Sequence, residues 1–338
     1  MSGEVGSLPP PRRVGGTVVM KVGVLAAMTL LAISASLFVG AADVAPSQVV
    51  ASLLGDSEYP TANTIVRDLR LPRALLAGVV GAGLGASGAA LQGYTRNPLA
   101  GPGILGFSAM AALGAVVALY FGASGLVVPA ALASTAVGAG LVVALVGRRQ
   151  GVATLVLAGV GVGALATALT GLLMNFAPNP WALSEIAYWL MGSLAQADPG
   201  VVGLSAALTA AGLALLMWIG ADLRTLTLGE DTARTLGVSL ARTQSLLIAG
   251  VALCVGSGVA VAGAIGFVGL FVPHLVRFLV TTDPARLIPI SALAGAGVLG
   301  LADLLAKSLS GQGTQLYLGI LTSLVGVPVF LWLAVRRT

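Results

Sequence analysis

Residues 74–91 read ALLAGVVGAGLGASGAAL, a run without a charged side chain. A run of this length and composition crosses the hydrocarbon core of a bilayer as a single helix. Gly78, Gly81, Gly85 and Gly88 recur in it three or four residues apart, so they share one face of that helix. Because small residues let two helix backbones approach closely where lipid offers no hydrophobic drive, the run predicts a helix packed inside a membrane bundle.

The composition of the whole chain agrees with this prediction. Of the 338 residues, 57% are hydrophobic and 9% are charged, whereas soluble domains carry about 25% charged residues. We therefore expect an all-α integral membrane protein. One cysteine, Cys254, and one histidine, His274, are too few for an intramolecular disulfide or for a metal site built on these residue types.

Ten apolar runs are read as membrane spans, which predicts about ten transmembrane helices. They cover residues 18–41, 74–91, 104–121, 126–147, 152–175, 200–219, 244–263, 265–280, 287–307 and 316–335. The seventh and eighth could instead be one span and a re-entrant segment, because glycines interrupt residues 244–280. We expect an N-terminal tail over 1–17 and one transmembrane domain over 18–335.

Ten spans place both termini on the same side of the membrane, and the basic residues indicate which side. With the termini inside, all but four of the 17 basic residues lie on the cytoplasmic side, as the positive-inside rule predicts. The four left outside are Arg67, Arg70, Arg73 and Lys307. The longest outer loop is then 42–73, and the longest inner loop is 220–243.

Polar groups inside the spans are scarce. Asp303 is the only carboxylate there and precedes Lys307 by one helical turn, which predicts an ion pair on the helix surface near its outer end. A lone acid makes a poor proton relay, so an ion-coupled secondary transporter is a less favoured alternative.

Two enzymatic activities are tested by motifs in the sequence. Residues 85–88 match the G-x-S-G of intramembrane serine proteases, with Ser87 as nucleophile and His274 as base, but glycine-mediated packing explains this tetrapeptide better. The chain also lacks the G-x-x-x-x-G-K-[ST] loop, so ATP hydrolysis would belong to a partner chain. We expect a transporter subunit without catalytic residues, and keep the protease as an alternative.

The inner loop contains a short helical pattern over residues 228–238. Glu230 and Asp231 lie in its first turn, Arg234 follows, and Gly237 is suited to end it. The pattern fits a knob for a cytoplasmic partner or a helix lying on the bilayer. Residues 96–103, RNPLAGPG, predict a turn after the second span, because proline and glycine end a helix.

Taken in order, these segments resemble the FecCD-type permease family, the membrane subunits of ABC importers for iron-siderophores, haem and cobalamin. The resemblance covers about residues 65–335. The matching segments are RLPR at 70–73, GAALQG at 88–93, RNPLA at 96–100, WLMGSL at 189–194, residues 229–238, GAIGFVGL at 263–270, PHLVR at 273–277, Ala302-Asp303 and residues 319–328.

The resemblance implies a type II ABC importer permease fold and a homodimer in the bacterial inner membrane. It further implies two cytoplasmic ATPase subunits that bind ATP and magnesium, a periplasmic or lipid-anchored binding protein, no cofactor on this chain and no nucleic-acid partner. The substrate would be an iron chelate (siderophore or haem) or cobalamin, moved by alternating access, and family frequency favours an iron chelate.

Site residues follow from the same resemblance. It implies an ATPase-coupling helix built on Gly229, Glu230, Asp231, Ala233, Arg234, Leu236 and Gly237. It implies a translocation gate at Asn97 and Leu99, opposed by Val152, Ala153 and Thr154. It implies docking of the binding protein at Arg70, Arg73 and Lys307, and a structural or coupling motif at Pro273, His274 and Arg277. The chain departs from the family pattern at Gly101, Pro284 and residues 314–317.

Overall fold

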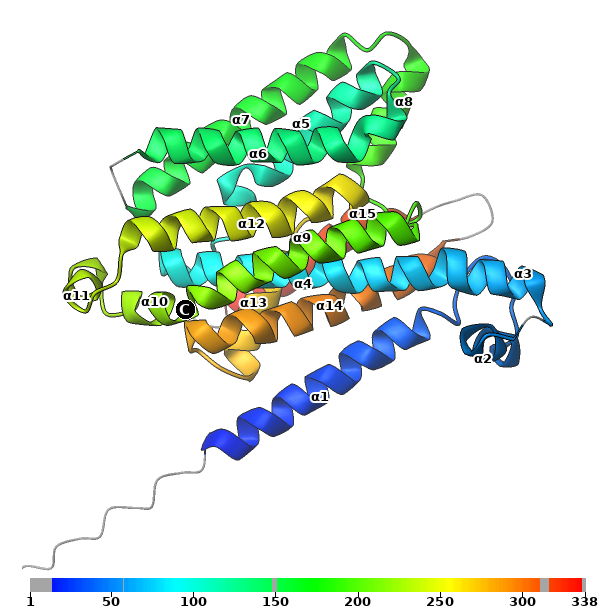
Figure 1. The fold of residues 1–338 in the computed structure, drawn as a ribbon, viewed down its shortest axis with the longest axis horizontal. Helices are drawn as coiled ribbons and strands as arrows, with labels where there is room; N and C mark the ends of the chain where they lie inside the picture. The colour runs from blue at the N-terminus through cyan, green and yellow to red at the C-terminus, as the bar shows by residue number, and fades with distance from the viewer. Residues whose placement is uncertain (1–13, 57, 148–150, 311–315, 336–338) are drawn as a thin grey trace, which may run out of the picture.

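A computed structural model of the chain describes residues 14–56, 58–147, 151–310 and 316–335. Within these ranges the ordered elements are helices and no strand occurs, which confirms the expected all-α class. The long helices run roughly side by side, so the two ends of the bundle present the connections between them (Figure 1).

The chain forms the following elements in order. They are α1 (Val14–Ala35), α2 (Pro46–Leu54), α3 (Pro60–Asn63), the π-helical turn η1 (Thr64–Arg70), α4 (Leu71–Thr95), η2 (Pro102–Leu105), α5 (Phe107–Tyr120), η3 (Ser124–Leu126), α6 (Val127–Val146), α7 (Val152–Asn175), α8 (Pro180–Leu190), α9 (Pro199–Trp218), α10 (Gly220–Leu226), α11 (Glu230–Thr235), α12 (Leu240–Ala262), α13 (Val268–Leu279), α14 (Pro284–Leu309) and α15 (Leu318–Val335).

The ten predicted spans correspond to ten helices, but not all of them are equally long. Among the described residues, seven helical segments are long and apolar enough to cross a membrane, and α5, α13 and α15 are shorter apolar helices. At about 1.5 Å per residue, the 12 residues of α13 cover only about 18 Å of a core about 30 Å thick. The eighth predicted span is thus a short helix that follows α12, not a full crossing.

The outer loop expected over 42–73 is largely helical. Residues 46–54 form α2, and the helix that carries α4 begins at Pro60. This segment has a small apolar core of its own, which includes Val49 and Val66. The segment between the first two spans folds in this way because these apolar residues bury one another.

The glycine ladder of residues 78–88 explains how α4 packs in the centre of the bundle. A side chain at Gly81 or Gly85 would collide with the backbone of α14 at Gly295 or Ser291. Gly88 lies equally close to the backbone of α13 at Gly269. The predicted close approach of helix backbones is therefore confirmed for three of the four glycines.

The remaining helices are arranged around this centre (Figure 1). Helices α5, α6 and α7 pack on one another on one side, and α1 packs against α14 on the other. We call the end that carries α10 and α11 the α11 end, and the end that carries α2 and α3 the α2 end. Helix α1 begins at the α11 end, and α15 also finishes there (Figure 1).

Candidate functional site

Helix α11 is a small projection held by one buried residue. Ala233 is fully buried, whereas Asp231, Arg234 and Leu236 are exposed. The helix ends at Thr235, and the predicted stop, Gly237, follows two residues later with a φ of 90°, a conformation that favours glycine. The Val238 amide donates to the Ala233 carbonyl and the Gly237 amide to the Arg234 carbonyl, the pair of bonds that defines a Schellman cap. Most of the surface of α11 is therefore free to contact a partner.

The preceding helix, α10, is fixed to two long helices by polar contacts. Arg224 donates from Nε to Asp283 Oδ1 at 2.9 Å and from Nη2 to Asp283 Oδ2 at 2.5 Å, at the start of α14. The hydrogen bond from Arg224 is the main reason that the pKa of Asp283 lies below its ordinary value. Thr243 of α12 donates to Asp222 of α10 at 2.7 Å. Helix α10 thus joins α12 and α14 at the α11 end.

The first half of the predicted gate lies in the turn after α4. The Asn97 side chain accepts a hydrogen bond from the Leu99 amide at 2.9 Å, and Leu99 is 52% exposed. Arg96, the residue before this turn, lies 3.9 Å from Glu230 of α11 as an ion pair. The turn and α11 are therefore neighbours, which sequence spacing alone does not indicate.

The opposing half of the predicted gate begins α7 at the same end of the bundle (Figure 1). Val152, Ala153 and Thr154 are all at least partly exposed. No hydrogen bond or ion pair within the described ranges joins them to Asn97 or Leu99.

The predicted motif at Pro273, His274 and Arg277 lies inside α13. His274 is buried and meets Phe330 of α15 edge-on, with ring centroids 6.2 Å apart. Arg277 donates to the Gln92 side chain of α4 at 3.4 Å. His274 lies within the helix, because α13 continues to Leu279. These residues connect α13 to its neighbouring helices.

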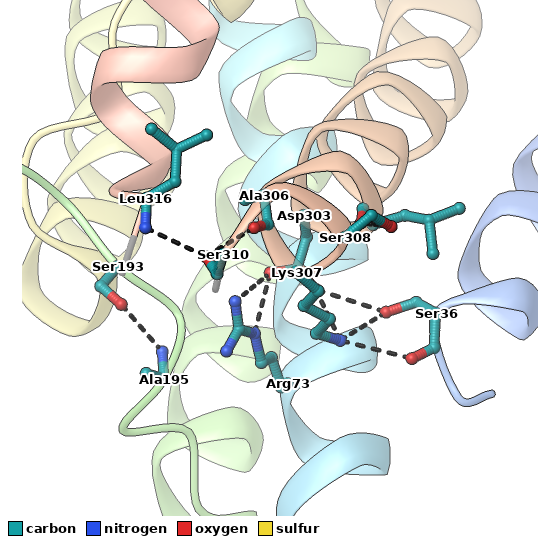
Figure 2. A network of polar contacts seen from close by, with 11 residues as sticks. Ser36, Arg73, Ser193, Ala195, Asp303, Ala306, Lys307, Ser308, Ser310 and Leu316 are labelled. Carbon is teal, nitrogen blue, oxygen red and sulfur yellow. Dashed lines mark hydrogen bonds and ion pairs between the residues drawn. The ribbon is translucent and has the colours of Figure 1, made fainter. Parts of the chain in front are cut away.

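At the α2 end, Asp303 is the centre of a buried polar cluster (Figure 2). It is fully buried, accepts from Arg73 Nε at 2.8 Å and lies 2.8 Å from Lys307 Nζ. Lys307 also donates to the Ser36 hydroxyl at 2.6 Å. The predicted Asp303–Lys307 pair exists, but it is buried and shared with α4 and with the end of α1, and not confined to a helix surface. Ser36 gave no signal in the sequence.

Arg70 is a second buried cation at this end. Its guanidinium donates to the carbonyl of Leu37 at 2.9 Å and to that of Ala42 at 2.5 Å. It therefore ties the chain after α1 to the start of α4. Of the three residues expected to dock a binding protein, Arg70 and Lys307 are engaged inside this fold, and Arg73 keeps 22% of its side chain exposed.

The residues of the protease alternative are not assembled as a catalytic pair. Ser87 is fully buried within α4, where Cys254 of α12 is its polar neighbour, and His274 faces α15. A fully buried serine is not accessible to a peptide substrate or to water. This arrangement does not support proteolysis.

An open groove of about 790 Å³ runs along one side of the bundle. Its walls are apolar and come from the end of α8, the connection after α12, and α15. The lining residues include Met191, Ala264, Gly319 and Leu324. Small and apolar walls offer a bulky solute few attachment points.

A long-helix bundle with a small projecting helix at one end is the architecture of the membrane subunit of an ABC importer. The FecCD transport family model matches residues 28–336. The chain belongs to this family, which confirms the resemblance found in the sequence.

Named relatives agree with this assignment. The chain is 37% identical over 320 residues to the vitamin B12 import system permease protein BtuC of Escherichia coli O157:H7, covering 92% of this chain and 94% of that protein. It is 40% identical over 277 residues to the cobalamin import system permease protein BtuC of Halobacterium salinarum, covering 81% and 74%. It is 39% identical over 290 residues to the ABC transporter permease protein YvrB of Bacillus subtilis, covering 83% and 81%.

A solved structure has the same fold. It is described as an inward-facing conformation of a metal-chelate type ABC transporter, and it aligns with a TM-score of 0.83 at 30% identity over 94% of this chain and 99% of that one. The chain is thus a membrane-spanning ABC importer permease of the FecCD type.

Proposed function

We propose that this permease moves a large metal chelate of the cobalamin class into the cytoplasm. The observation that carries the proposal is the 37% identity to a vitamin B12 permease along 92% of the chain. Family frequency favoured an iron chelate, so siderophores and haem remain the substrates to compare with cobalamin.

The proposed assembly is a homodimer with two ATPase subunits and a substrate-binding protein. Helix α11 would contact the ATPase through Glu230, Asp231, Arg234 and Leu236, while Ala233 anchors it and Gly229 and Gly237 bound it. The supporting observation is that its polar surface and Leu236 are exposed whereas Ala233 is buried. ATP and magnesium would bind to the partner.

The proposed orientation places the α11 end in the cytoplasm of a bacterial inner membrane, with both termini on that side. Arginines concentrate at this end, in the connections and in the adjoining ends of the long helices, where the positive-inside rule counts them. Those within the described ranges are Arg96, Arg224, Arg234, Arg242, Arg277 and Arg286.

The proposed transport cycle is alternating access. The turn of Asn97 and Leu99, with Val152, Ala153 and Thr154, would close the cytoplasmic side of a path between two copies of the chain. The apolar groove along α15 supports a path that releases its substrate readily. ATP binding to the partner would shift the equilibrium between the two facing states.

The test is uptake into cells that lack their own chelate permeases but produce this chain with its ATPase and binding protein. Labelled cobalamin, ferric siderophore and haem are compared. We expect cobalamin to accumulate, and to stop accumulating when the phosphate-binding lysine of the ATPase is replaced. Uptake of only an iron chelate would contradict the proposal that cobalamin is the substrate. Uptake that survives loss of ATPase activity would contradict the proposal that import is driven by ATP.

A further inference from the structure

The contact between Arg224 and Asp283 joins the segment that carries α11 to the start of α14. The guanidinium donates two hydrogen bonds to the two carboxylate oxygens, at 2.9 and 2.5 Å. A planar guanidinium matched to a carboxylate in this way fixes orientation as well as distance. Arg286, which lies 3.6 Å from the same carboxylate, makes only a longer, single contact.

Asp283 has a second role, which fixes the position of this contact on α14. Its Oδ1 atom also accepts from the Ala285 amide at 3.1 Å and thereby caps the first turn of α14. One side chain thus defines where α14 begins and where α10 attaches to it.

The apolar residues around the ion pair are closely packed. A side chain at Gly220 of α10 would meet Ala285 of α14 at 3.3 Å. Leu223 is fully buried, and it and Pro284 both lie near Gly93 of α4. Helices α10, α14 and α4 therefore meet in one packed junction.

The connection from α10 to α11 is equally short and hydrogen-bonded. The amides of Thr227, Leu228 and Gly229 donate to the carbonyls of Arg224, Thr225 and Leu226. A displacement of α11 should therefore also move α10, because these backbone hydrogen bonds make the connection between them rigid.

We propose that Arg224 is a positioning residue for transport, which clamps α10 and α11 to the start of α14 so that movement of α11 is delivered to the packed α14–α4 pair. This inference rests on the proposed function, in which α11 contacts the ATPase. Helices α14 and α4 should move together, because Gly81 and Gly85 bring their two backbones into contact and leave no room for one helix to slide along the other. The turn of the gate follows directly after α4.

The experiment uses the complete transporter, with its ATPase and binding protein, in liposomes, where cobalamin uptake and ATP hydrolysis are measured together. Arg224→Ala and Asp283→Asn are each expected to lower the uptake per ATP hydrolysed about fivefold, the low end of typical coupling between sites. Asparagine still caps α14, so loss of the cap does not explain that result. The double variant is expected to be no worse than either single variant, because both changes remove one contact.

Arg286→Ala is the matched control. It removes a positive charge beside the same carboxylate but leaves the two-bond contact, so its uptake per ATP is expected to be unchanged. An unchanged ratio in Arg224→Ala, or an equal loss in Arg286→Ala, would overturn the proposal.

A second measurement requires no partner. Hydrogen exchange of the purified chain is expected to accelerate in residues 220–238 of Arg224→Ala and to remain unchanged in Arg286→Ala. Unaltered exchange in Arg224→Ala overturns the clamp by itself. If the wild-type chain does not associate with an ATPase, the proposed function fails, while the exchange result still decides whether the clamp exists.

Discussion

Arg73 of α4 and Asp303 of α14 form an ion pair at the α2 end of the bundle, where Nε and Nη2 of the arginine both lie 2.8 Å from one carboxylate oxygen. Lys307 occupies the other oxygen. One buried carboxylate is therefore shared by two cations, Arg73 from α4 and Lys307 from α14. The cluster holds these helices together at the end opposite α11.

Removal of the Asp303 carboxylate is predicted to destabilise the fold. Asp303→Ala leaves Arg73 and Lys307 without a counter-charge, and breaking a buried pair costs about 3–5 kcal/mol. Thermal denaturation in detergent measures the loss. Asp303→Ala combined with Lys307→Met is expected to recover part of it, because the unpaired buried ammonium is gone. Equal stability of Asp303→Ala and the wild type would show that the cluster does not stabilise the bundle.

The packing of α4 on α14 predicts different outcomes for two glycines of one helix. Gly85→Ala forces a methyl group onto the Ser291 carbonyl, so we expect a loss of about 1–3 kcal/mol, as for other overpacked cores. Gly78→Ala is the control, because its methyl would meet only the flexible Ile33 side chain at 3.3 Å. Melting temperatures of the two variants decide the question, and equal effects would contradict the packing argument.

The α2-end cations predict a division between docking and folding. Arg73→Ala is expected to weaken association with the binding protein, more so at low salt, because it is partly exposed whereas the other two expected docking residues, Arg70 and Lys307, are buried. Arg70→Ala is expected chiefly to lower thermal stability, because it removes the donors of two backbone carbonyls. Binding-protein affinity measured at two salt concentrations separates them. Affinity that is insensitive to both salt and Arg73 would refute the docking assignment.

The exposed position of Leu99 predicts a functional change without loss of stability. Leu99→Gly is expected to increase leakage of substrate from loaded liposomes in the absence of ATP, because it thins the turn proposed to close the path. Its melting temperature should stay near that of the wild type, since surface substitutions typically change stability by about 0.5 kcal/mol or less. Leu54→Ala, at a position that is 83% exposed at the opposite end, is the control and should not leak. If Leu99→Gly does not increase leakage, the gate lies elsewhere in the chain.

The pKa of Asp283 predicts how the Arg224 contact responds to acid. Because the folded-state pKa lies below the ordinary value of 3.8, the contact stabilises the fold fully above that value and loses its effect as the pH falls through the lower, folded-state pKa. Protection of residues 220–238 from hydrogen exchange should therefore be the same at pH 6 and at pH 8, once the intrinsic exchange rate is corrected. Asp283→Asn should not alter this lack of pH dependence. A clamp that weakened in this range would require another titrating group.

Much of the membrane architecture follows from the sequence because hydrocarbon imposes strict demands on length and polarity. Apolar runs and scarce charges predicted the helices, and the three- and four-residue glycine spacing predicted which face of α4 is packed. The end of α11 was predictable as well, because Gly237 supplies a backbone conformation that other residues adopt with difficulty. These are local properties, readable from neighbouring residues.

Contacts between distant residues were decided by the tertiary structure alone. Hydropathy does not indicate that Asp303 binds Arg73, that Arg70 is buried under the chain after α1, or that α13 is too short to cross. Nor does it bring Arg96 beside Glu230 or Arg224 beside Asp283. The physical reason is that apolar length specifies a helix but not its neighbours, whereas the position of a charge in a bundle depends on which helices pack closely enough to supply its partner.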